Sequence, residues 1–184
     1  MRERQWASSL KLIDKGHRNR YNFAKTKVSG YVLDAACGCG YGSHILSEVA
    51  EVTGIDLDED TIAFARKNWS GPDYKVADVR EPQGAFDWVV SFETLEHLPE
   101  PLPALKAFRE SENLIISTPN QLRYPFKPES YEGNTYPHIR HYTPDELENL
   151  LEEAGWKPVE RHGQDTKRSE VTMGNGMFLV WVCK

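Results

Sequence analysis

The sequence has few cysteines and no long apolar segment, and each shortage excludes a class of protein. Its 184 residues contain three cysteines, an odd number that cannot form a complete disulfide framework. No apolar run approaches the roughly 20 residues that a membrane-spanning helix needs. The first residues also lack the apolar stretch of a secretory signal. We therefore expect a cytoplasmic protein that has no membrane partner.

The charged residues are distributed unevenly along the chain. The formal net charge is −6. Residues 1–30 carry eight Lys or Arg against two acids, a net +6, whereas the rest carries fourteen against twenty-six, a net −12. An acidic body disfavours nucleic acid as a partner, because binding to phosphates needs clustered cations. The basic leader is either a solvated amphipathic segment or a contact for an anion.

Short runs rich in β-branched and aromatic residues alternate with runs of helical periodicity, which predicts an α/β fold with a doubly wound, mostly parallel sheet. The last two expected strands are about 15 residues apart, too long for a tight hairpin and too short for a helical crossover, so an antiparallel last strand is expected. The expected strands are residues 31–35, 52–56, 74–77, 87–92, 113–117, 156–161 and 177–182. The expected helices are residues 43–50, 59–68, 102–110 and 144–154, after one or two leading helices over residues 5–27 that break near Gly16.

A glycine-rich segment, residues 37–42 (CGCGYG), follows the first expected strand. A glycine loop at the carboxyl end of a strand is compatible with dinucleotide binding. Asp34, at the end of that strand, argues otherwise, because its carboxylate repels a pyrophosphate and attracts a cation. S-adenosylmethionine (SAM) carries an ammonium and a sulfonium and no phosphate, so the loop favours SAM over a nicotinamide cofactor.

Two further acids end the second and third expected strands. Asp56 is placed to accept hydrogen bonds from both ribose hydroxyls, a requirement that nicotinamide cofactors share. Asp78 is placed to accept the adenine amino group. Leu57 and Val79, which follow these acids, offer apolar faces to the adenine ring.

On these motifs the sequence resembles the class I SAM-dependent methyltransferases over residues 30–160. The resemblance implies a Rossmann-like, seven-stranded sheet whose last strand is antiparallel. It divides the chain into an N-terminal helical lid, residues 1–29, and a SAM-binding domain, residues 30–184. The matching motifs are residues 32–40, 54–57, 77–79, 86–90 and 115–120.

The resemblance also implies which other residues contact the cofactor. Arg20 would pair with the methionine carboxylate of SAM, and Tyr21 would hydrogen-bond it. The alternative is that Tyr21 only packs the leading helix. The remaining implied contacts are Ala35, Gly38, Gly40 and Phe92.

A Glu-x-x-Glu-His sequence follows the fourth expected strand. If this segment is helical, Glu93, Glu96 and His97 share one face and offer ligands to a divalent metal such as magnesium or zinc. His138 or His141 would supply a fourth ligand. The arrangement resembles metal-dependent O-methyltransferases of the ubiquinone-biosynthesis and small-RNA 2′-O-methylating types. Two alternatives remain open: His97 as a metal-free general base, and a structural role in capping the turn.

The expected function is methyl transfer from SAM to a hydroxyl or other nucleophile of a small molecule, with Glu93, His97 and His141 as candidate catalytic residues. The loop of residues 120–142 and the leading helices are expected to bind this acceptor. Its aromatic and cationic side chains suit a planar or anionic molecule. RNA 2′-O-methylation with a metal site and SAM binding without catalysis are the alternatives. The sequence does not predict an oligomeric state.

Overall fold

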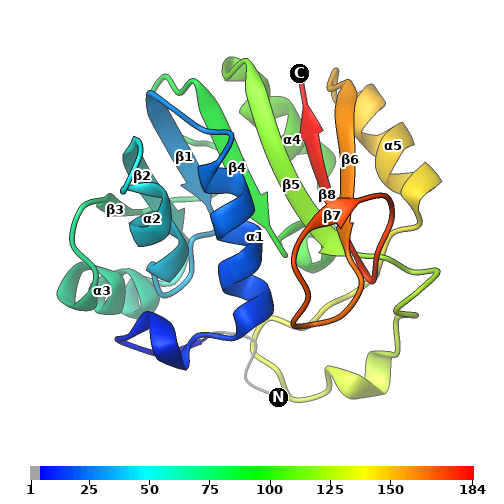
Figure 1. The fold of residues 1–184 in the computed structure, drawn as a ribbon, viewed down its shortest axis with the longest axis horizontal. Coiled ribbons are helices and arrows are strands. Elements are labelled where there is room, and N and C mark those ends of the chain that lie inside the picture. Colours follow the sequence, from blue (N-terminus) through cyan, green and yellow to red (C-terminus); the bar gives the residue numbers. More distant parts are fainter. Residues whose placement is uncertain (1–4) are drawn as a thin grey trace.

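The apolar runs along the chain form one mixed sheet in the computed structural model, which describes residues 5–184. Its strands lie in the order β3-β2-β1-β4-β5-β8-β6-β7 (Figure 1). The strands from β3 to β5 in this order are parallel, whereas β8 is antiparallel to both neighbours. The bounds are β1 (Tyr31–Ala35), β2 (Glu51–Asp56), β3 (Asp73–Val76), β4 (Trp88–Phe92), β5 (Asn113–Pro119), β6 (Pro158–Gln164), β7 (Thr172–Met173) and β8 (Phe178–Cys183).

The predicted α/β fold with an antiparallel last strand is confirmed, but the strand number differs from seven. The two-residue strand β7 pairs with the end of β6 and makes the sheet eight-stranded. The extra strand forms because the chain after β6 folds back on itself before it enters β8. Residues 165–171, which connect β6 to β7, are named the bridging loop below.

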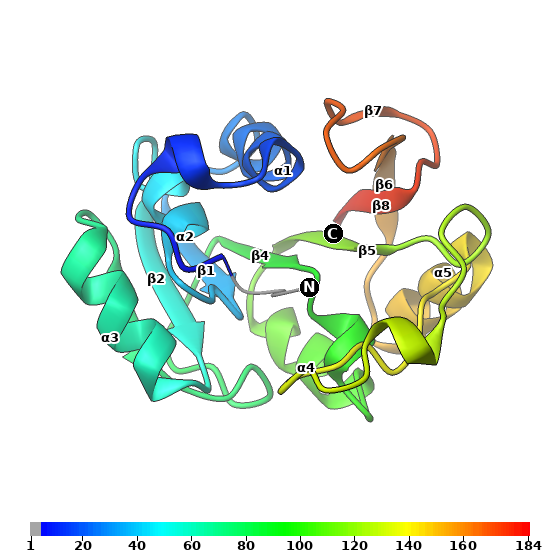
Figure 2. The same cartoon turned by 90° about the horizontal axis from the view of Figure 1, so that it is seen from below.

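Helices cover both faces of the sheet (Figure 2). The helices α1 and α2 pack on one face around Val32, Val90 and Ile115, and α4 and α5 pack on the other. The bounds are α1 (Lys15–Lys25), α2 (Tyr41–Leu46), α3 (Glu59–Asn68), α4 (Leu102–Ala107) and α5 (Pro144–Glu153). Short 3-10 turns are η1 (Leu10–Leu12), η2 (Leu95–His97), η3 (Phe108–Glu110) and η4 (Pro128–Ser130). None of the helices among the described residues is long and apolar enough to cross a membrane.

The leading segment breaks near Gly16 as predicted, but Gly16 itself lies inside the first turn of α1. The break falls at Ile13 and Asp14, between η1 and α1. A Cβ on Gly16 would lie 2.1 Å from the carbonyl oxygen of Lys167 in the bridging loop. The glycine therefore permits close packing of a helix rather than ending one.

The N-terminal leader and the body of the chain share a hydrophobic cluster. Tyr21, Ala24 and Val28 from the leader are buried against Val32 of β1. Residues 1–4 of the expected lid lie outside the described residues. That the leader acts as a lid stays a prediction.

Candidate active site

The turn between β1 and α2 is held by backbone contacts to β2. The N–H of Cys37 donates to the carbonyl of Ile55 (2.8 Å), and the N–H of Gly38 donates to Asp56 Oδ2 (3.0 Å). Gly38 and Gly40 have positive φ angles of 53° and 87°, which side chains rarely allow. The glycine-rich segment is therefore a fixed loop at the carboxyl edge of the parallel strands.

These two glycines are needed for different reasons. A Cβ on Gly40 would lie 2.5 Å from the Cβ of Ala65 and 2.9 Å from the ring of Tyr74, so Gly40 is required for packing. A Cβ on Gly38 would meet no atom of the described residues within 4 Å. The backbone at Gly38 therefore faces open space, where a ligand can approach it closely.

Asp34 is fully buried at the end of β1, and hydroxyl groups of the chain contact both of its oxygens. Tyr21 donates to Oδ1 (3.0 Å), and Ser43 donates to Oδ2 (2.6 Å). Burial raises the pKa of Asp34 to about 6, although the two hydroxyls favour the ionised form. Because Asp34 has no accessible surface, direct contact with a ligand ammonium would require groups that cover it to move.

Asp56 ends β2 and connects the glycine loop to the turn that follows β2. Its Oδ2 accepts from the N–H of Gly38, and its Oδ1 accepts from the N–H of Asp58 (both 3.0 Å). Leu57 beside it is 56% exposed, so an adenine ring could lie against its side chain. The structure thus places Asp56 and Gly38 side by side, as the cofactor prediction requires.

The third expected strand end is arranged differently. Asp78 accepts hydrogen bonds from the guanidinium of Arg80 (2.5 and 3.0 Å), which lowers the pKa of Asp78. Val79 packs in the core on the α4 and α5 face and has little accessible surface. Ala35 and Phe92, at the ends of β1 and β4, are also buried.

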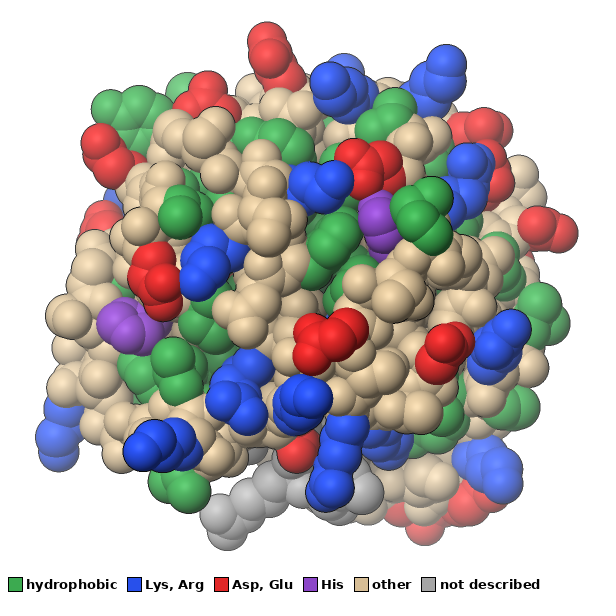
Figure 3. All heavy atoms as spheres, viewed as in Figure 1, with side chains coloured by type: hydrophobic (Ala, Val, Ile, Leu, Met, Phe, Trp, Pro, Cys, Tyr) green, Lys and Arg blue, Asp and Glu red, His purple; other side chains and the backbone are tan. Residues whose placement is uncertain are grey.

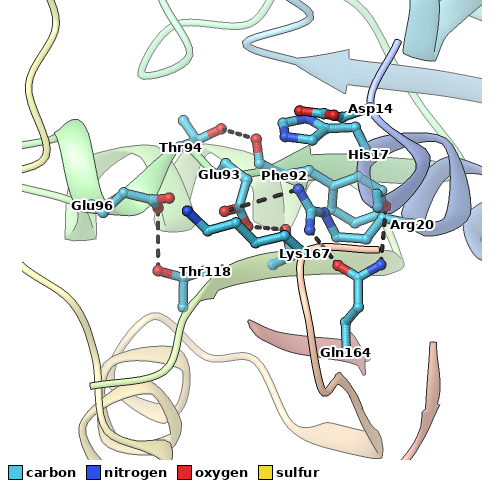
Figure 4. Close-up of polar contacts among 12 residues, drawn as sticks. Asp14, His17, Arg20, Phe92, Glu93, Thr94, Glu96, Thr118, Gln164 and Lys167 are labelled. Atoms are coloured by element: carbon cyan, nitrogen blue, oxygen red, sulfur yellow. Dashed lines mark hydrogen bonds and ion pairs between the residues drawn. The ribbon is translucent and has the colours of Figure 1, made fainter. Parts of the chain in front are cut away.

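Arg20 on α1 is a buried cation held over the end of the sheet (Figure 4). Its Nη1 donates to Gln164 Oε1 (2.6 Å), and its Nη2 lies 4.0 Å from Glu93 Oε2. The guanidinium lies 4.8 Å from the centre of the Phe178 ring. Among residues 5–184 its buried Nε finds no hydrogen-bond partner, so one donor is available to a ligand.

Tyr21, the next residue on α1, lies against the glycine loop. Its ring packs edge-on against Phe92, with the ring centres 5.0 Å apart, while its hydroxyl donates to Asp34. A Cβ on Gly42 would lie 2.0 Å from the Tyr21 ring. Tyr21 packs α1 against the sheet and donates its hydroxyl to Asp34, and its contact with the cofactor stays a prediction.

The segment after β4 does not form the expected α-helical turn. Glu93 has a left-handed φ of 52°, and η2 is a short 3-10 helix. The side chain of Glu93 accepts from Ser117 Oγ (2.7 Å) at the neighbouring strand and faces Arg20. The expectation that Glu93, Glu96 and His97 share one helix face is therefore wrong, because the chain turns sharply at Glu93.

Glu96 points into the protein instead. It is fully buried, and its Oε2 accepts from Thr118 Oγ1 (3.2 Å). Its Oε1 is buried and has no hydrogen-bond partner in the described part of the chain. Burial and the nearby charge of Glu93 raise the pKa of Glu96 well above its usual range. An unsatisfied carboxylate oxygen of this kind favours either a proton or a cation.

Three of the four expected metal ligands come together. Ligand atoms of Glu96, His97 and His138 lie within 4.8 Å of one another, and Glu93 is not in this group. The rings of His97 and His138 pack edge-on at 4.6 Å. Burial and the neighbouring histidines lower the pKa of His138 to about 3, so its ring is neutral and suited to bind a metal.

Backbone carbonyls orient His97 and His141. The carbonyl of Pro137 lies 3.2 Å from His97 Nδ1, and that of Tyr124 lies 2.6 Å from His141 Nδ1. Because a carbonyl only accepts, each Nδ1 carries the proton, and in a neutral ring each Nε2 is the basic nitrogen. His141 Nε2 contacts His138 Nδ1 (3.0 Å), so His141 orients the His138 ring and is not itself one of the three grouped ligands.

Sequence reasoning missed several residues of the site. Gln164 is fully buried and contacts Arg20, although 144 residues separate them. Ser43 and Ser117 hold the two acids Asp34 and Glu93. Ser43 directly follows the glycine-rich segment and Ser117 lies in the motif of residues 115–120, so both could have been found there, whereas no local pattern marks Gln164.

The methyltransferase-domain family (Methyltransf_23) matches residues 3–161. A probable S-adenosylmethionine-dependent methyltransferase of Mycolicibacterium smegmatis is 34% identical over 68% of this chain and 51% of its own length. A ubiquinone biosynthesis O-methyltransferase of Ruegeria sp. is 34% identical over 72% of this chain and 62% of its own length. The chain thus spans about half to two-thirds of the length of these curated relatives.

Solved structures share the fold at low sequence identity. A possible histamine N-methyltransferase of Thermotoga maritima superimposes with a TM-score of 0.73 at 19% identity, over 92% of this chain and 89% of that one. A magnesium protoporphyrin IX methyltransferase of Synechocystis gives 0.70 at 18% identity, over 95% and 87%. Together with the glycine loop and Asp56, the family match shows that the chain belongs to the class I SAM-dependent methyltransferases.

Proposed function

We propose that this chain transfers a methyl group from SAM to a hydroxyl, or another nucleophile, of a small molecule. One observation carries the proposal: β1, which leads into the glycine loop, pairs directly with β4, which leads into Glu93, Glu96 and His97. A donor held by the loop would therefore present its methyl group beside these side chains. The similarity to ubiquinone biosynthesis O-methyltransferases supports an oxygen acceptor.

On this proposal, the residues around the glycine loop bind and orient the donor. SAM, when bound, supplies a methyl group on a positively charged sulfur. Asp56 would accept the ribose hydroxyls, and the open backbone at Gly38 leaves room for the amino-acid part. Arg20 would donate its unpartnered Nε–H to the carboxylate. The charge of Asp34 would favour the ammonium, directly or through the hydroxyl of Tyr21.

His97 is the proposed base that removes the acceptor proton. Its Nδ1 faces the Pro137 carbonyl, which leaves Nε2 as the basic nitrogen. Glu93, held by Ser117 and near Arg20, would orient the acceptor. Proton removal matters for an aliphatic hydroxyl and less for a phenol, whose own pKa is lower.

A metal-assisted version of this reaction is favoured by one specific feature, the orphaned Oε1 of Glu96. Glu96, His97 and His138 would hold the ion, and magnesium and zinc both suit this donor set. A bound divalent ion would lower the pKa of an acceptor hydroxyl. Dialysis against a chelator separates the two versions: loss of turnover that magnesium or zinc restores supports the metal, and unchanged turnover supports His97 alone.

The acceptor is proposed to be a small molecule rather than RNA. A pocket of about 310 Å³ lies in the loop after β5 and is lined by Tyr124, Pro125, Lys127, Ser130 and Tyr131. This volume suits a single ring system.

The test of the proposed function is calorimetric binding of SAM, followed by assay of S-adenosylhomocysteine formation with panels of phenols, aliphatic alcohols and short RNAs. Binding with turnover of a small molecule supports the proposal. Turnover of RNA alone would show that the acceptor is RNA and not a small molecule. Binding without any turnover would indicate a SAM-binding protein that is not an enzyme.

A further inference from the structure

The bridging loop is fixed on α1 by buried contacts. Asn19 Nδ2 donates to the carbonyl of Ser169 (2.9 Å), and the buried Gln164 donates to the same carbonyl (2.7 Å). The close approach of Gly16 to the carbonyl of Lys167 adds a third contact. The loop backbone therefore holds a defined position beside Arg20 at the carboxyl edge of the sheet.

The charged side chains of the bridging loop are unequally paired. Each of its two acids has an ion-pair partner on a neighbouring element, whereas no carboxylate among residues 5–184 lies at ion-pair distance from Lys167 or Arg168. The pairs are Asp165 with Arg123 and Glu170 with Lys15, each at 3.6 Å. The loop therefore presents positive charge that the described part of the chain does not neutralise.

Lys167 extends across the candidate site, between α1 and the segment that follows β4 (Figure 4). Its ammonium donates to the hydroxyl of Tyr124 (3.2 Å) and lies 4.9 Å from the centre of that ring. Burial is the main cause that lowers the pKa of His17 on α1 and of His138 in the loop after β5, and the charge of Lys167 adds to both shifts. The ammonium is thus within electrostatic reach of α1 and of the proposed acceptor pocket that Tyr124 lines.

We propose that the methyl acceptor carries an anionic group, a carboxylate or a phosphate, and that Lys167 binds this group while the acceptor atom lies beside Glu93 and His97. The inference rests on the proposed function, because it names the substrate class of the same site. Lys167 would be the residue that determines specificity, with Arg168 contributing positive charge from the same loop.

The distribution of charge over the molecule supports an anionic ligand at this place. Residues 31–184 are strongly acidic, so an anion is repelled by most of the surface. Lys and Arg side chains gather at the lower centre of Figure 3, where α1 begins and the bridging loop turns. This contrast would direct an anion to the mouth of the site. The positive charges of the leader other than Arg20, which the donor site does not use, would contribute to this attraction.

The experiment measures binding of small probes to the protein loaded with S-adenosylhomocysteine, so that the donor site is filled and turnover is not needed. The probes are benzoate, phenyl phosphate and the neutral benzamide, measured by calorimetry at low and high salt. We expect at least one anion to bind about tenfold more tightly than benzamide, with a preference that salt weakens. Benzoate against phenyl phosphate distinguishes a carboxylate from a phosphate.

Three variants decide whether Lys167 is responsible. Lys167→Ala should weaken binding of the preferred anion about tenfold and leave benzamide unchanged, and Lys167→Arg should keep most of the preference. Lys106→Ala, which removes an exposed lysine of α4, is the matched control and should change nothing. Equal binding of all three probes, no binding of either anion, or an unchanged preference in Lys167→Ala would overturn the proposal. Failure of the proposed function is distinguishable, because it appears as absent methyl transfer whatever the probes show.

Discussion

The donor half and the acceptor half of the site are built from different kinds of contacts. In the donor half, Gly38 and Asp56 lie at the ends of two paired strands, and the backbone of one bonds the side chain of the other. In the acceptor half, Lys167 of the bridging loop meets Tyr124 of the loop after β5 across 43 residues of sequence. Parallel strands bring their ends together by themselves, so the donor half needs little else. The acceptor half depends on how the bridging loop packs against α1 and the loop after β5.

The largest expected effect is a loss of turnover from a substitution in the acceptor half alone. His97→Ala should lower turnover by roughly 10²–10⁴-fold, the usual contribution of a general base. Affinity for SAM should stay as in the wild type, because His97 lies after β4 and is held against Pro137 and His138 of the loop after β5. Single-turnover kinetics and calorimetry measure the two effects. Equal losses in both would mean that the halves are not separable.

The next prediction concerns the buried charge of the donor half. Because Asp34 has a folded-state pKa of about 6 against an ordinary 3.8, the folded protein binds the proton more tightly than the unfolded chain. This group alone should therefore lower the free energy of unfolding as pH rises from about 4 to about 6, by roughly 3 kcal/mol in total. SAM binding should change in the opposite sense and strengthen over the same window.

Comparison with Asp34→Asn isolates this contribution. Urea unfolding of the wild type and of the variant between pH 4 and pH 7 should give curves whose difference changes only in that window. A constant difference would show that Asp34 does not titrate there.

Asp56→Ala tests the donor half without touching the acceptor half. Loss of the ribose contacts and of the bond to Gly38 should weaken SAM binding by about 1–3 kcal/mol, the range for a charge-assisted hydrogen bond. Asp56→Asn keeps one carbonyl acceptor and should give a smaller loss. Asp73→Ala, at an exposed residue of the adjacent strand β3, is the control. Wild-type affinity in Asp56→Ala would contradict the ribose assignment.

The smallest expected effect tests the packing between α1 and the bridging loop. An alanine usually stabilises a helix relative to glycine by about 0.5–1 kcal/mol. In Gly16→Ala the sign should reverse, with a net loss of about 1–2 kcal/mol, because the new Cβ would overlap the carbonyl of Lys167. Thermal unfolding measures the change. A stabilised variant would show that the loop can move away without cost.

The features that the sequence predicts well are those that local patterns encode. The helix Glu59–Asn68 is predicted with its observed bounds, because Asp58 caps it and its apolar residues recur with helical spacing. Asp34 and Asp56 are correctly placed at strand ends. The antiparallel direction of β8 follows from the length of the preceding connection.

The features that the sequence does not predict depend on tertiary contacts. Gly16 resembles a helix breaker, yet the bridging loop requires a glycine at that position within the helix. Glu93 has a left-handed backbone conformation that glutamate rarely adopts, so the conformational propensity of glutamate does not predict a turn there. Gln164 is one polar residue at the end of a strand, and only the fold reveals that Arg20 is its partner.

The place of β8 has a consequence for synthesis of the protein. This strand follows all the others in the chain, yet it is inserted between β5 and β6 and every one of its residues is buried. A ribosome-bound chain that has emerged only as far as β6 would expose the apolar edge of β5, a template for pairing with other nascent chains. Completion of the sheet must therefore wait for the strand that is translated last among the eight, and chaperone demand should be highest just before it emerges.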